Sequence, residues 1–532
     1  TQQPVAARDG VVTLRLPPLS GVVLQREEAS VLPRSAGLLL HPTSLPGPYG
    51  GGDLGPEARK FVDFLARAGQ SWWQLLPLNQ PGPASCGSPY QALSAFAGNV
   101  ALLSPDDLVA DGWLPQADLE PLPKGGAGVY DWEVVTAYKE QLVRRAFERL
   151  QPEWAAAPDY ETFCQCQGDW LKDYALFRAA KNRYKGLPWT QWPQGLRERR
   201  PVALDELRRQ EGAAIDLYQF EQYLFFKQAR RLREYANKQG VKLLGDLPLY
   251  VAHDSSDVWS RQQYFLLDGE GEPVGVAGVP PDYFSKDGQL WGNPLYDWKA
   301  MEQQNYRWWR RRLEVVLELT DWVRLDHFRG IEAYWDVPAT AETAVSGRWQ
   351  PGPGASLLAA LRQEEGVLPL VAEDLGIITP EVDALKEAFS LPGMAVLQFA
   401  FRQTEEGVKN PLVSRNTIVY TGTHDNDTSR SWFETLARQD PGLASDIARL
   451  LQVRGGGVEA VVRALVRYAY ACDGDVTILP VQDVLGLGRE GRMNVPGVAK
   501  GNWSWRLSPG ALGERQAVWL AEVCEQYRRT ER

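Results

Sequence analysis

Short apolar runs alternate along this chain with longer amphipathic stretches. Eight runs, rich in Leu, Ile, Val or Trp and ended by polar or Gly-flanked turns, are typical of parallel strands buried on both faces. They lie at 36–40, 71–77, 241–246, 321–326, 367–373, 394–400, 417–425 and 475–479. Between them, apolar residues recur every three or four positions, which predicts helices at 57–68, 218–238, 298–319, 381–389 and 457–470. Eight strands alternating with helices predict an α/β protein built as a (β/α)8 TIM barrel.

Three stretches do not fit a minimal barrel. The stretch from about 80 to 240, between the second and third strands, has helical periodicity, for example at 136–150, and predicts an inserted, mainly helical subdomain. The stretch 251–297 is rich in Gly, Pro and aromatics, and we expect it to be a loop over the active face. Residues 1–33, which alternate at 11–24 like two half-buried strands, read as an extension of uncertain role before a catalytic barrel at 34–532.

Three of the predicted strands stop at a carboxylate. Asp326, Glu373 and Asp425 each follow an apolar run within polar, Gly-flanked turns. The carboxyl ends of barrel strands form the catalytic face, so these side chains are expected to share one site. Most acidic residues are only solvated surface charges, but three at strand ends are unlikely to arise by chance. Two facing carboxylates are what cleavage of a glycosidic bond needs, one to attack and one to protonate the leaving oxygen.

The neighbours of these carboxylates suggest separate tasks. Arg324 and Asp326 lie two positions apart and project to the same side of a strand, so the guanidinium would hold Asp326 ionised, as a nucleophile requires. A structural ion pair at the barrel rim is the alternative. Glu373 follows an apolar run that would raise its pKa toward that of a general acid, although spacing alone does not decide whether Glu373 or Asp374 faces the site.

Further polar residues lie at the same predicted face. His424 and Asp425 offer groups suited to sugar hydroxyls, and Asp425 could distort a sugar ring toward the transition state, although His424 could equally be a hydrogen-bonded strand-end histidine. Asp246 ends the third strand and is either a structural acceptor or a sugar contact. The turn holding Ser88 and Tyr90 places an aromatic ring after the second strand, where it could stack on a sugar, but turn chemistry alone explains its Gly and Pro.

Composition narrows the partner class. A net charge of −10 argues against nucleic acid and against an anionic membrane surface, whereas 20 Trp and 20 Tyr exceed the needs of a core and suit sugar faces. Five scattered cysteines predict no disulfide framework, and Cys164 and Cys166 have no further ligand at metal spacing. No apolar run reaches the roughly 18–20 residues of a membrane span, and residues 1–4 do not resemble a signal region, so a cytoplasmic location is expected.

An ordered set of motifs after about residue 35 resembles the amylomaltases, also called 4-α-glucanotransferases or disproportionating enzymes. Each motif is weak alone, but the ordered set is specific. It comprises 37–49 (Gly-Leu-Leu-Leu-His-Pro-Thr-Ser-Leu-Pro-Gly-Pro-Tyr), 88–91 (Ser-Pro-Tyr-Gln), 245–248 (Gly-Asp-Leu-Pro), 278–285 (Gly-Val-Pro-Pro-Asp-Tyr-Phe-Ser), 291–294 (Trp-Gly-Asn-Pro), 324–330 (Arg-Leu-Asp-His-Phe-Arg-Gly), 372–376 (Ala-Glu-Asp-Leu-Gly), 423–428 (Thr-His-Asp-Asn-Asp-Thr), 492–497 (Arg-Met-Asn-Val-Pro-Gly) and 501–506 (Gly-Asn-Trp-Ser-Trp-Arg).

The resemblance implies a role for each matching position. Asp326 would be the nucleophile, Glu373 the general acid/base and Asp425 the stabiliser of the transition state. The attacked glucose would lie against Tyr90, Ser88, Asp246, Arg324, His327 and His424. The acceptor side would be covered by Gln289, Trp291 and Asn293. The family uses no metal and no organic cofactor, and it lacks the β-sandwich that follows the barrel in α-amylases.

The implied reaction is retaining transfer. An α-1,4-glucan or maltooligosaccharide is cut, held as an ester on the nucleophile and passed to the 4-hydroxyl of glucose or another glucan, with cyclisation of long chains as a further outcome. A monomer with no nucleic-acid or membrane partner is expected. Two departures stand out: residues 1–33 lie outside the pattern, and the stretch before Ser88 lacks a Tyr that several relatives carry near the place of Ser85. An α-glucan hydrolase and a non-catalytic glucan-binding protein are the alternatives.

Overall fold

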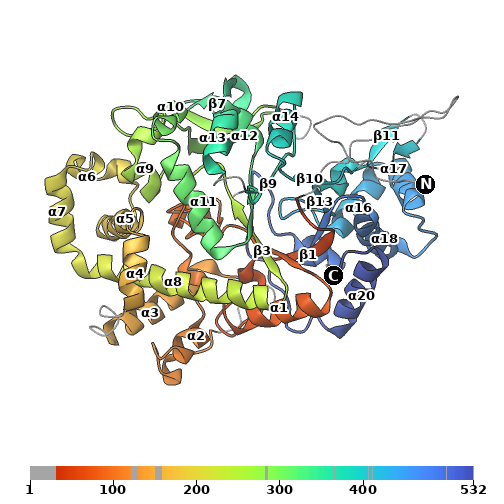
Figure 1. The fold of residues 1–532 in the computed structure, drawn as a ribbon, viewed down its shortest axis with the longest axis horizontal. Coiled ribbons are helices and arrows are strands. Elements are labelled where there is room, and N and C mark those ends of the chain that lie inside the picture. Colours follow the sequence, from red (N-terminus) through yellow and green to blue (C-terminus); the bar gives the residue numbers. More distant parts are fainter. Residues whose placement is uncertain are drawn as a thin grey trace, which may run out of the picture.

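The computed structural model describes residues 31–122, 129–149, 158–281, 286–362, 366–404, 407–409, 411, 413–498 and 500–530. Eight parallel strands form its centre, with helices around them (Figure 1). In spatial order they are β10 (Gly393–Val396), β13 (Thr417–Tyr420), β14 (Val476–Pro480), β1 (Ser35–Leu39), β2 (Trp72–Gln74), β3 (Lys242–Leu247), β6 (Trp322–Leu325) and β9 (Leu370–Ala372). The Ala372 amide donates to the Pro392 carbonyl at 2.8 Å, which brings the two end strands together. The predicted barrel is therefore present and nearly closed.

Each predicted barrel strand overlaps an observed one, but the second, fifth, sixth and seventh are clearly shorter than predicted, and in the sixth a helix replaces the second half. The run 394–400 was expected to be extended throughout, whereas β10 ends at Val396 and a short helix, α15 (Leu397–Ala400), follows. Leu, Gln and Ala in this second half are good helix formers, and a short apolar run alone does not distinguish a strand from a buried helical turn.

The helices that pack on the barrel follow the predicted stretches. They are α1 (Pro56–Arg67), α8 (Gly212–Lys238), α14 (Pro380–Ala388) and α18 (Gly457–Ala471). The single helix predicted at 298–319 is wrong: α10 (Trp298–Glu302) and α11 (Arg307–Leu319) are separate. Asn305 and Tyr306 between them adopt φ of 48° and 49°, and this left-handed backbone cannot continue a right-handed helix. Outside the insertion between β2 and β3, the remaining helices are α9 (Ser256–Ser260), α12 (Arg329–Glu332), α13 (Gly354–Leu361), α16 (Ser429–Gln439), α17 (Pro441–Leu450), α19 (Val481–Val484) and α20 (Glu514–Gln526).

A helical insertion separates β2 from β3. It contains α2 (Pro105–Ala110), α3 (Trp132–Arg149), α4 (Pro158–Cys166), α5 (Leu171–Arg183), α6 (Gln194–Arg197) and α7 (Pro201–Gln210), which lie to one side of the barrel before the chain returns along α8 (Figure 1). A buried ion pair ties this insertion to the barrel. Lys139 of α3 donates to Asp53 Oδ2 at 3.1 Å and to the Ala101 carbonyl at 2.8 Å.

A second, antiparallel sheet was not predicted. Its strands lie in the order β5 (Gln289–Pro294), β4 (Gly275–Val279), β7 (Ala333–Pro338) and β8 (Arg348–Pro351). The stretch 251–297 was expected to be only a loop, because β4 and β5 are rich in Gly and Pro and lack a polar–apolar alternation. A two-stranded sheet of β11 (Arg402–Thr404) and β12 (Gly407–Lys409) is a further addition.

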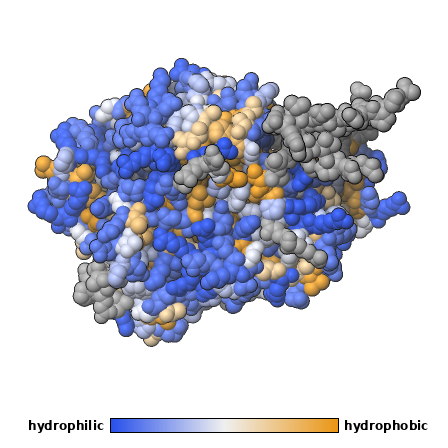
Figure 2. All heavy atoms as spheres, in the orientation of Figure 1, coloured by the Kyte–Doolittle hydropathy of each residue, from blue (hydrophilic) through white to orange (hydrophobic). Residues whose placement is uncertain are grey.

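The ends of the chain differ in what the structure describes. Beyond β14, the residues up to 530 that are described form α19 and α20 and no further sheet. The two half-buried strands predicted at 11–24 lie outside the described residues. None of the helices within the described ranges combines the length and apolar character that crossing a membrane requires. On the face shown in Figure 2, hydrophilic residues cover most of the surface.

Candidate active site

A buried arginine links two acidic residues at the carboxyl ends of β3 and β6. The register of these strands pairs Asp246 with Arg324. Arg324 Nε donates to Asp246 Oδ1 at 3.1 Å and Nη2 donates to Oδ2 at 2.9 Å, a bidentate pair. The same Nη2 donates to Asp326 Oδ1 at 2.8 Å. The side chains of Asp246 and Arg324 are 0% and 5% exposed whereas that of Asp326 is 30% exposed, so only the last is open to a ligand.

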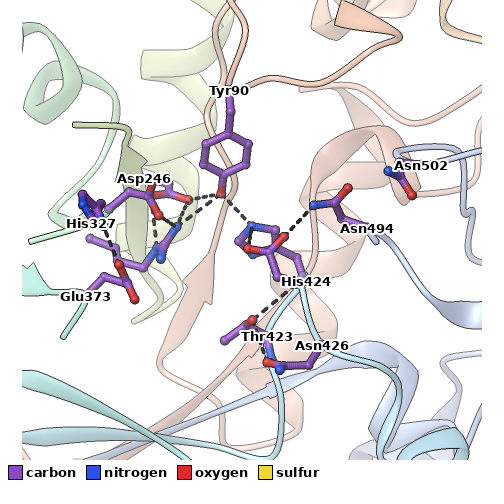
Figure 3. A network of polar contacts seen from close by, with 12 residues as sticks. Tyr90, Asp246, His327, Glu373, Thr423, His424, Asn426, Asn494 and Asn502 are labelled. Atoms are coloured by element: carbon purple, nitrogen blue, oxygen red, sulfur yellow. Dashed lines mark hydrogen bonds and ion pairs between the residues drawn. The ribbon is translucent and has the colours of Figure 1, made fainter. Parts of the chain in front are cut away.

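Tyr90 connects this group to the end of β13. Its hydroxyl donates to Asp246 Oδ2 at 2.6 Å and lies 2.8 Å from His424 Nε2 (Figure 3). Because the hydroxyl has one proton and gives it to Asp246, His424 Nε2 must be the donor in the second bond. Burial lowers the pKa of His424, which favours this neutral Nε2–H form. The Tyr90 and His424 rings stack 5.4 Å apart. Figure 3 shows Tyr90 between the Asp246 side and the His424 side of the site.

Glu373 leaves the barrel beside Asp326. Leu325 of β6 pairs in register with Ala372 of β9. Asp326 directly follows Leu325, and Glu373 directly follows Ala372. Two backbone amides hold the Glu373 carboxyl: the His327 N–H donates to Oε2 at 2.7 Å and the Leu375 N–H donates to Oε1 at 3.2 Å. The His327 backbone adopts a φ of 52°, an uncommon conformation for a residue other than glycine.

Asp374 does not share this position. Its Oδ1 accepts the Met394 N–H at 2.7 Å and its Oδ2 pairs with Lys386 Nζ at 2.6 Å. The side chain is therefore directed to β10 and α14. Of the two neighbours that the sequence left open, Glu373 is the one at the site.

Burial separates the acidities of the two facing carboxyls. It raises the pKa of Glu373 to about 8, with the Asp326 charge as the second cause. Burial also raises the pKa of Asp326, to about 6, but the Arg324 guanidinium opposes this rise. Asp326 therefore loses its proton before Glu373 does. At neutral pH the pair holds one carboxylate and one carboxylic acid.

Asp425 closes the other side of the site, after β13. Asn494 Nδ2 donates to its Oδ1 at 2.6 Å, and His424 Nε2 lies 3.4 Å from its Oδ2. Its side chain is 46% exposed, which leaves it accessible to a ligand. Asn494 and Trp503 were missed as site residues, although both lie in the quoted motifs 492–497 and 501–506. The Trp503 ring lies 5.7 Å from Tyr90 and 5.9 Å from His424.

The residues expected on the acceptor side lie on β5. Trp291 packs edge-to-face on His327, with ring centroids 4.8 Å apart, and its Nε1 donates to Gln289 Oε1 at 3.2 Å. Burial lowers the pKa of His327 to about 4, so this ring is neutral at pH 7. Asn293 is buried and donates to the Val251 carbonyl at 2.8 Å, which anchors β5. Ser88 contributes backbone bonds within its turn, as its carbonyl accepts the Gln91 N–H at 3.3 Å.

The cysteines and acidic residues do not assemble into a metal centre in the described ranges. No group of three or more His, Cys, Asp or Glu side chains there has an arrangement that could hold an ion. Cys164 and Cys166 are free thiols.

A parallel barrel that carries an arginine-paired carboxylate and a half-buried carboxylic acid at the carboxyl ends of adjacent strands is typical of an enzyme of glycosidic-bond chemistry. Known proteins narrow this class. The family model described as 4-alpha-glucanotransferase matches residues 40–512. The 4-alpha-glucanotransferase of Thermus thermophilus is 45% identical over 505 residues, 93% of this chain and 99% of that protein. The chloroplastic/amyloplastic enzyme of Solanum tuberosum is 44% identical over 481 residues, 89% of this chain and 82% of that protein.

Solved structures of amylomaltases have the same fold as this chain. The amylomaltase of Streptococcus agalactiae, in complex with acarbose, superposes with a TM-score of 0.88 at 35% identity, covering 94% of this chain and 100% of that one. The amylomaltase of Corynebacterium glutamicum shares the fold at a TM-score of 0.75 and 18% identity, over 94% of this chain and 75% of that one. The chain belongs to the 4-α-glucanotransferase, or amylomaltase, family, and its activity is 4-α-glucan transfer on α-glucans.

Proposed function

We propose that this protein is a retaining 4-α-glucanotransferase in which Asp326 is the nucleophile and Glu373 the general acid/base. The observation that carries the proposal is the pairing of Arg324 with Asp326 at 2.8 Å beside a Glu373 carboxyl whose pKa is raised to about 8. An ionised attacker and a protonated acid are both needed at the start of the reaction, and the two environments supply both at pH 7.

The first half-reaction breaks the α-1,4 bond. An Asp326 oxygen attacks the anomeric carbon while the Glu373 proton passes to the departing 4-oxygen. The products are a glucan with a free 4-hydroxyl and a glycosyl ester on Asp326. In the second half, Glu373 takes the proton of an acceptor 4-hydroxyl, and the acceptor oxygen displaces Asp326 from the anomeric carbon. At the end of the second half, Asp326 is again a carboxylate and Glu373 again carries its proton.

Electrostatics supports the change of Glu373 from acid to base. The Asp326 charge is the second cause of the raised pKa of Glu373, after burial. Ester formation removes that charge, so the pKa of Glu373 falls while the intermediate exists. The proton already given to the leaving group is then less readily regained, and Glu373 remains ready to accept a proton from the incoming hydroxyl.

The roles of the remaining side chains are assigned from their exposure to solvent and their contacts. Asp425, with a side chain 46% exposed, is proposed to bind sugar hydroxyls and stabilise the distorted ring. His424, Tyr90 and His327 are proposed to line the same subsite. Asp246 has no exposed side-chain surface and accepts from both Arg324 and Tyr90, which supports a positioning role for it over direct sugar contact.

Transfer must compete with water for the ester. A bound acceptor can reach effective molarities of order 10⁵ M or more, which exceeds bulk water. We assign acceptor binding to Trp291 and Gln289 on β5, with the ring of Trp291 fixed by its contact with His327. The proposed donors are α-1,4-glucans and maltooligosaccharides, the proposed acceptors are glucose and other glucans, and long donors are expected to yield cyclic products as well. Asn293 supports this surface through its buried bond to the Val251 carbonyl. Ser88 is proposed to bind substrate on the other side of the cut bond, in the turn that carries Tyr90.

Chromatography of products from maltotriose tests the proposal. Transfer gives glucose together with a ladder of longer maltooligosaccharides. Conversion to glucose and maltose alone would instead identify an α-glucan hydrolase. The variant Asp326→Asn should bind maltooligosaccharides and turn none over, and turnover near that of the parent would reject the assignment of the nucleophile.

A further inference from the structure

The Glu373 carboxyl is held by two loops that belong to different strands. The loop after β6 supplies the His327 N–H at 2.7 Å, and the loop after β9 supplies the Leu375 N–H at 3.2 Å. The Glu373 carbonyl also accepts the Phe328 N–H at 3.1 Å. The direction of the carboxyl therefore depends on the relative position of these two loops. Figure 3 shows the bond from His327 to Glu373.

Arg329 joins the same two loops. It begins α12, three residues after Asp326, and its Nη1 donates to the carbonyl of Ile377 at 2.8 Å, four residues after Glu373. Arg329 is 7% exposed, and the charges of Glu332 and Glu381 act on it, but its side-chain hydrogen bond in the described structure goes to the Ile377 carbonyl and not to either acid. Burial lowers its pKa, and its Nε is buried without a hydrogen-bond partner. A buried cation held by a carbonyl and not by an acid is costly, which indicates a purpose for its place.

Trp349 covers this arginine. The ring lies on β8, the edge strand of the antiparallel sheet, and its centroid is 4.0 Å from the Arg329 guanidinium carbon. Trp349 pairs in register with Trp335, whose ring packs against it at 5.1 Å. The aromatic face stabilises the cation and limits its access to water, which strengthens the bond to the Ile377 carbonyl.

We propose that Arg329 is a positioning residue for the reaction: it ties the loop after β6 to the loop after β9 and so fixes the Glu373 carboxyl for proton transfer. This inference rests on the acid/base role proposed for Glu373. Arg329 does not touch the reacting atoms, because its bond is to the outer part of the loop at Ile377, a residue 47% exposed. Asp326, Arg324 and Asp374 are the charged groups that act on Glu373, and none of them contacts Arg329 in the described structure.

The substitution Arg329→Met tests the proposal, because it keeps an apolar stem beside Trp349 and removes the donor. We expect kcat for maltotriose to fall about 10- to 100-fold, since small misplacements of a catalytic group have effects of this size. KM should stay near the parental value, because Tyr90 and Arg324 are untouched. Arg329→Lys keeps a cation and one donor and should recover part of the lost kcat. A parental kcat in a folded variant would overturn the proposal.

A matched control separates positioning from stability. Arg199 of the insertion makes a similar contact, with its guanidinium carbon 4.2 Å from the ring of Trp259 in α9. Arg199→Met should lower the melting temperature and leave kcat unchanged. If Arg329→Met does not fold, Arg329→Lys carries the test alone, with a fall in kcat of several-fold expected and a parental kcat as the contradicting result.

Infrared spectroscopy reads Glu373 without turnover. The parent spectrum minus that of Glu373→Gln reports the Glu373 carboxyl as pH is raised. In Arg329→Met the titration should be displaced from the parental pH, because both the burial and the His327 amide bond that act on this pKa depend on the position of the loops. A titration at the parental pH would overturn the proposal. Absence of glucan transfer by the parent would refute the proposed function, whereas a displaced titration would still support the link between the loops.

Discussion

The pH dependence of kcat/KM follows from the two facing carboxyls. Activity requires Asp326 ionised and Glu373 protonated, so the rate rises as Asp326 loses its proton and falls as Glu373 loses its own. Because the pKa of Asp326 is raised to about 6 and that of Glu373 to about 8, this form predominates near pH 7 and is lost toward acid and toward base. The profile should be a bell with its maximum near pH 7 and a fall of about tenfold two pH units to either side.

Initial rates with maltotriose well below KM, measured from pH 4.5 to 9.5 at constant ionic strength, provide the assay. The two limbs belong to the pair, since each charge affects the other. In Glu373→Gln the weak residual rate should lack the basic limb, because the group that titrates there is gone. A parental profile with no fall up to pH 10, or an optimum below pH 5, would refute the assignment of the acid.

Three further changes test separate parts of the account. Arg324→Met should abolish turnover and lower the free energy of unfolding by about 3–5 kcal/mol, because Asp246 is left buried without its charged partner. The maltotriose assay checks turnover and calorimetry checks stability. A stable, active variant would contradict the geometry. Trp291→Ala should raise the ratio of hydrolysis to transfer, measured as new reducing ends per glucose released, and an unchanged ratio would remove Trp291 from the acceptor side. Arg529→Met should lower the free energy of unfolding, measured by chemical denaturation, by about 3 kcal/mol or more and leave kcat unchanged. The reason is that the buried guanidinium donates to five backbone carbonyls, those of Tyr470, Ser35, Asp475, Cys472 and Gly474. A denaturation midpoint equal to that of the parent would contradict this.

The barrel was predictable because its strands are buried on both faces. Such strands appear in the sequence as continuous apolar runs. Where a run stops at Asp326 or at Glu373, the acidic residue shows where the strand ends. The antiparallel sheet was not predictable in the same way. Residues 275–279 read Gly-Val-Ala-Gly-Val, with no alternation, and their pairing with β7 joins segments separated by more than fifty positions. The break at Asn305 and Tyr306 depends on a backbone conformation that periodicity does not report.

The site divides along a similar line. Carboxylates at strand ends were found from local pattern, because the fold fixes which face they share. Glu373 could be told from Asp374 only in three dimensions, where Asp374 is paired with Lys386 and accepts the Met394 N–H. Asn494 was missed because its loop follows β14 and approaches Asp425 from a distant part of the chain. A motif marked that loop, but nothing local assigned its amide to a carboxylate.

Trapping the covalent intermediate tests the central claim most directly. Glu373→Gln retains the nucleophile and lacks the base that would activate an acceptor, so an activated donor such as α-maltosyl fluoride should load the enzyme without release. Peptide mass spectrometry should then find one maltosyl group, on Asp326. An unmodified enzyme after complete loss of fluoride, or a maltosyl group on any other residue, would contradict the account.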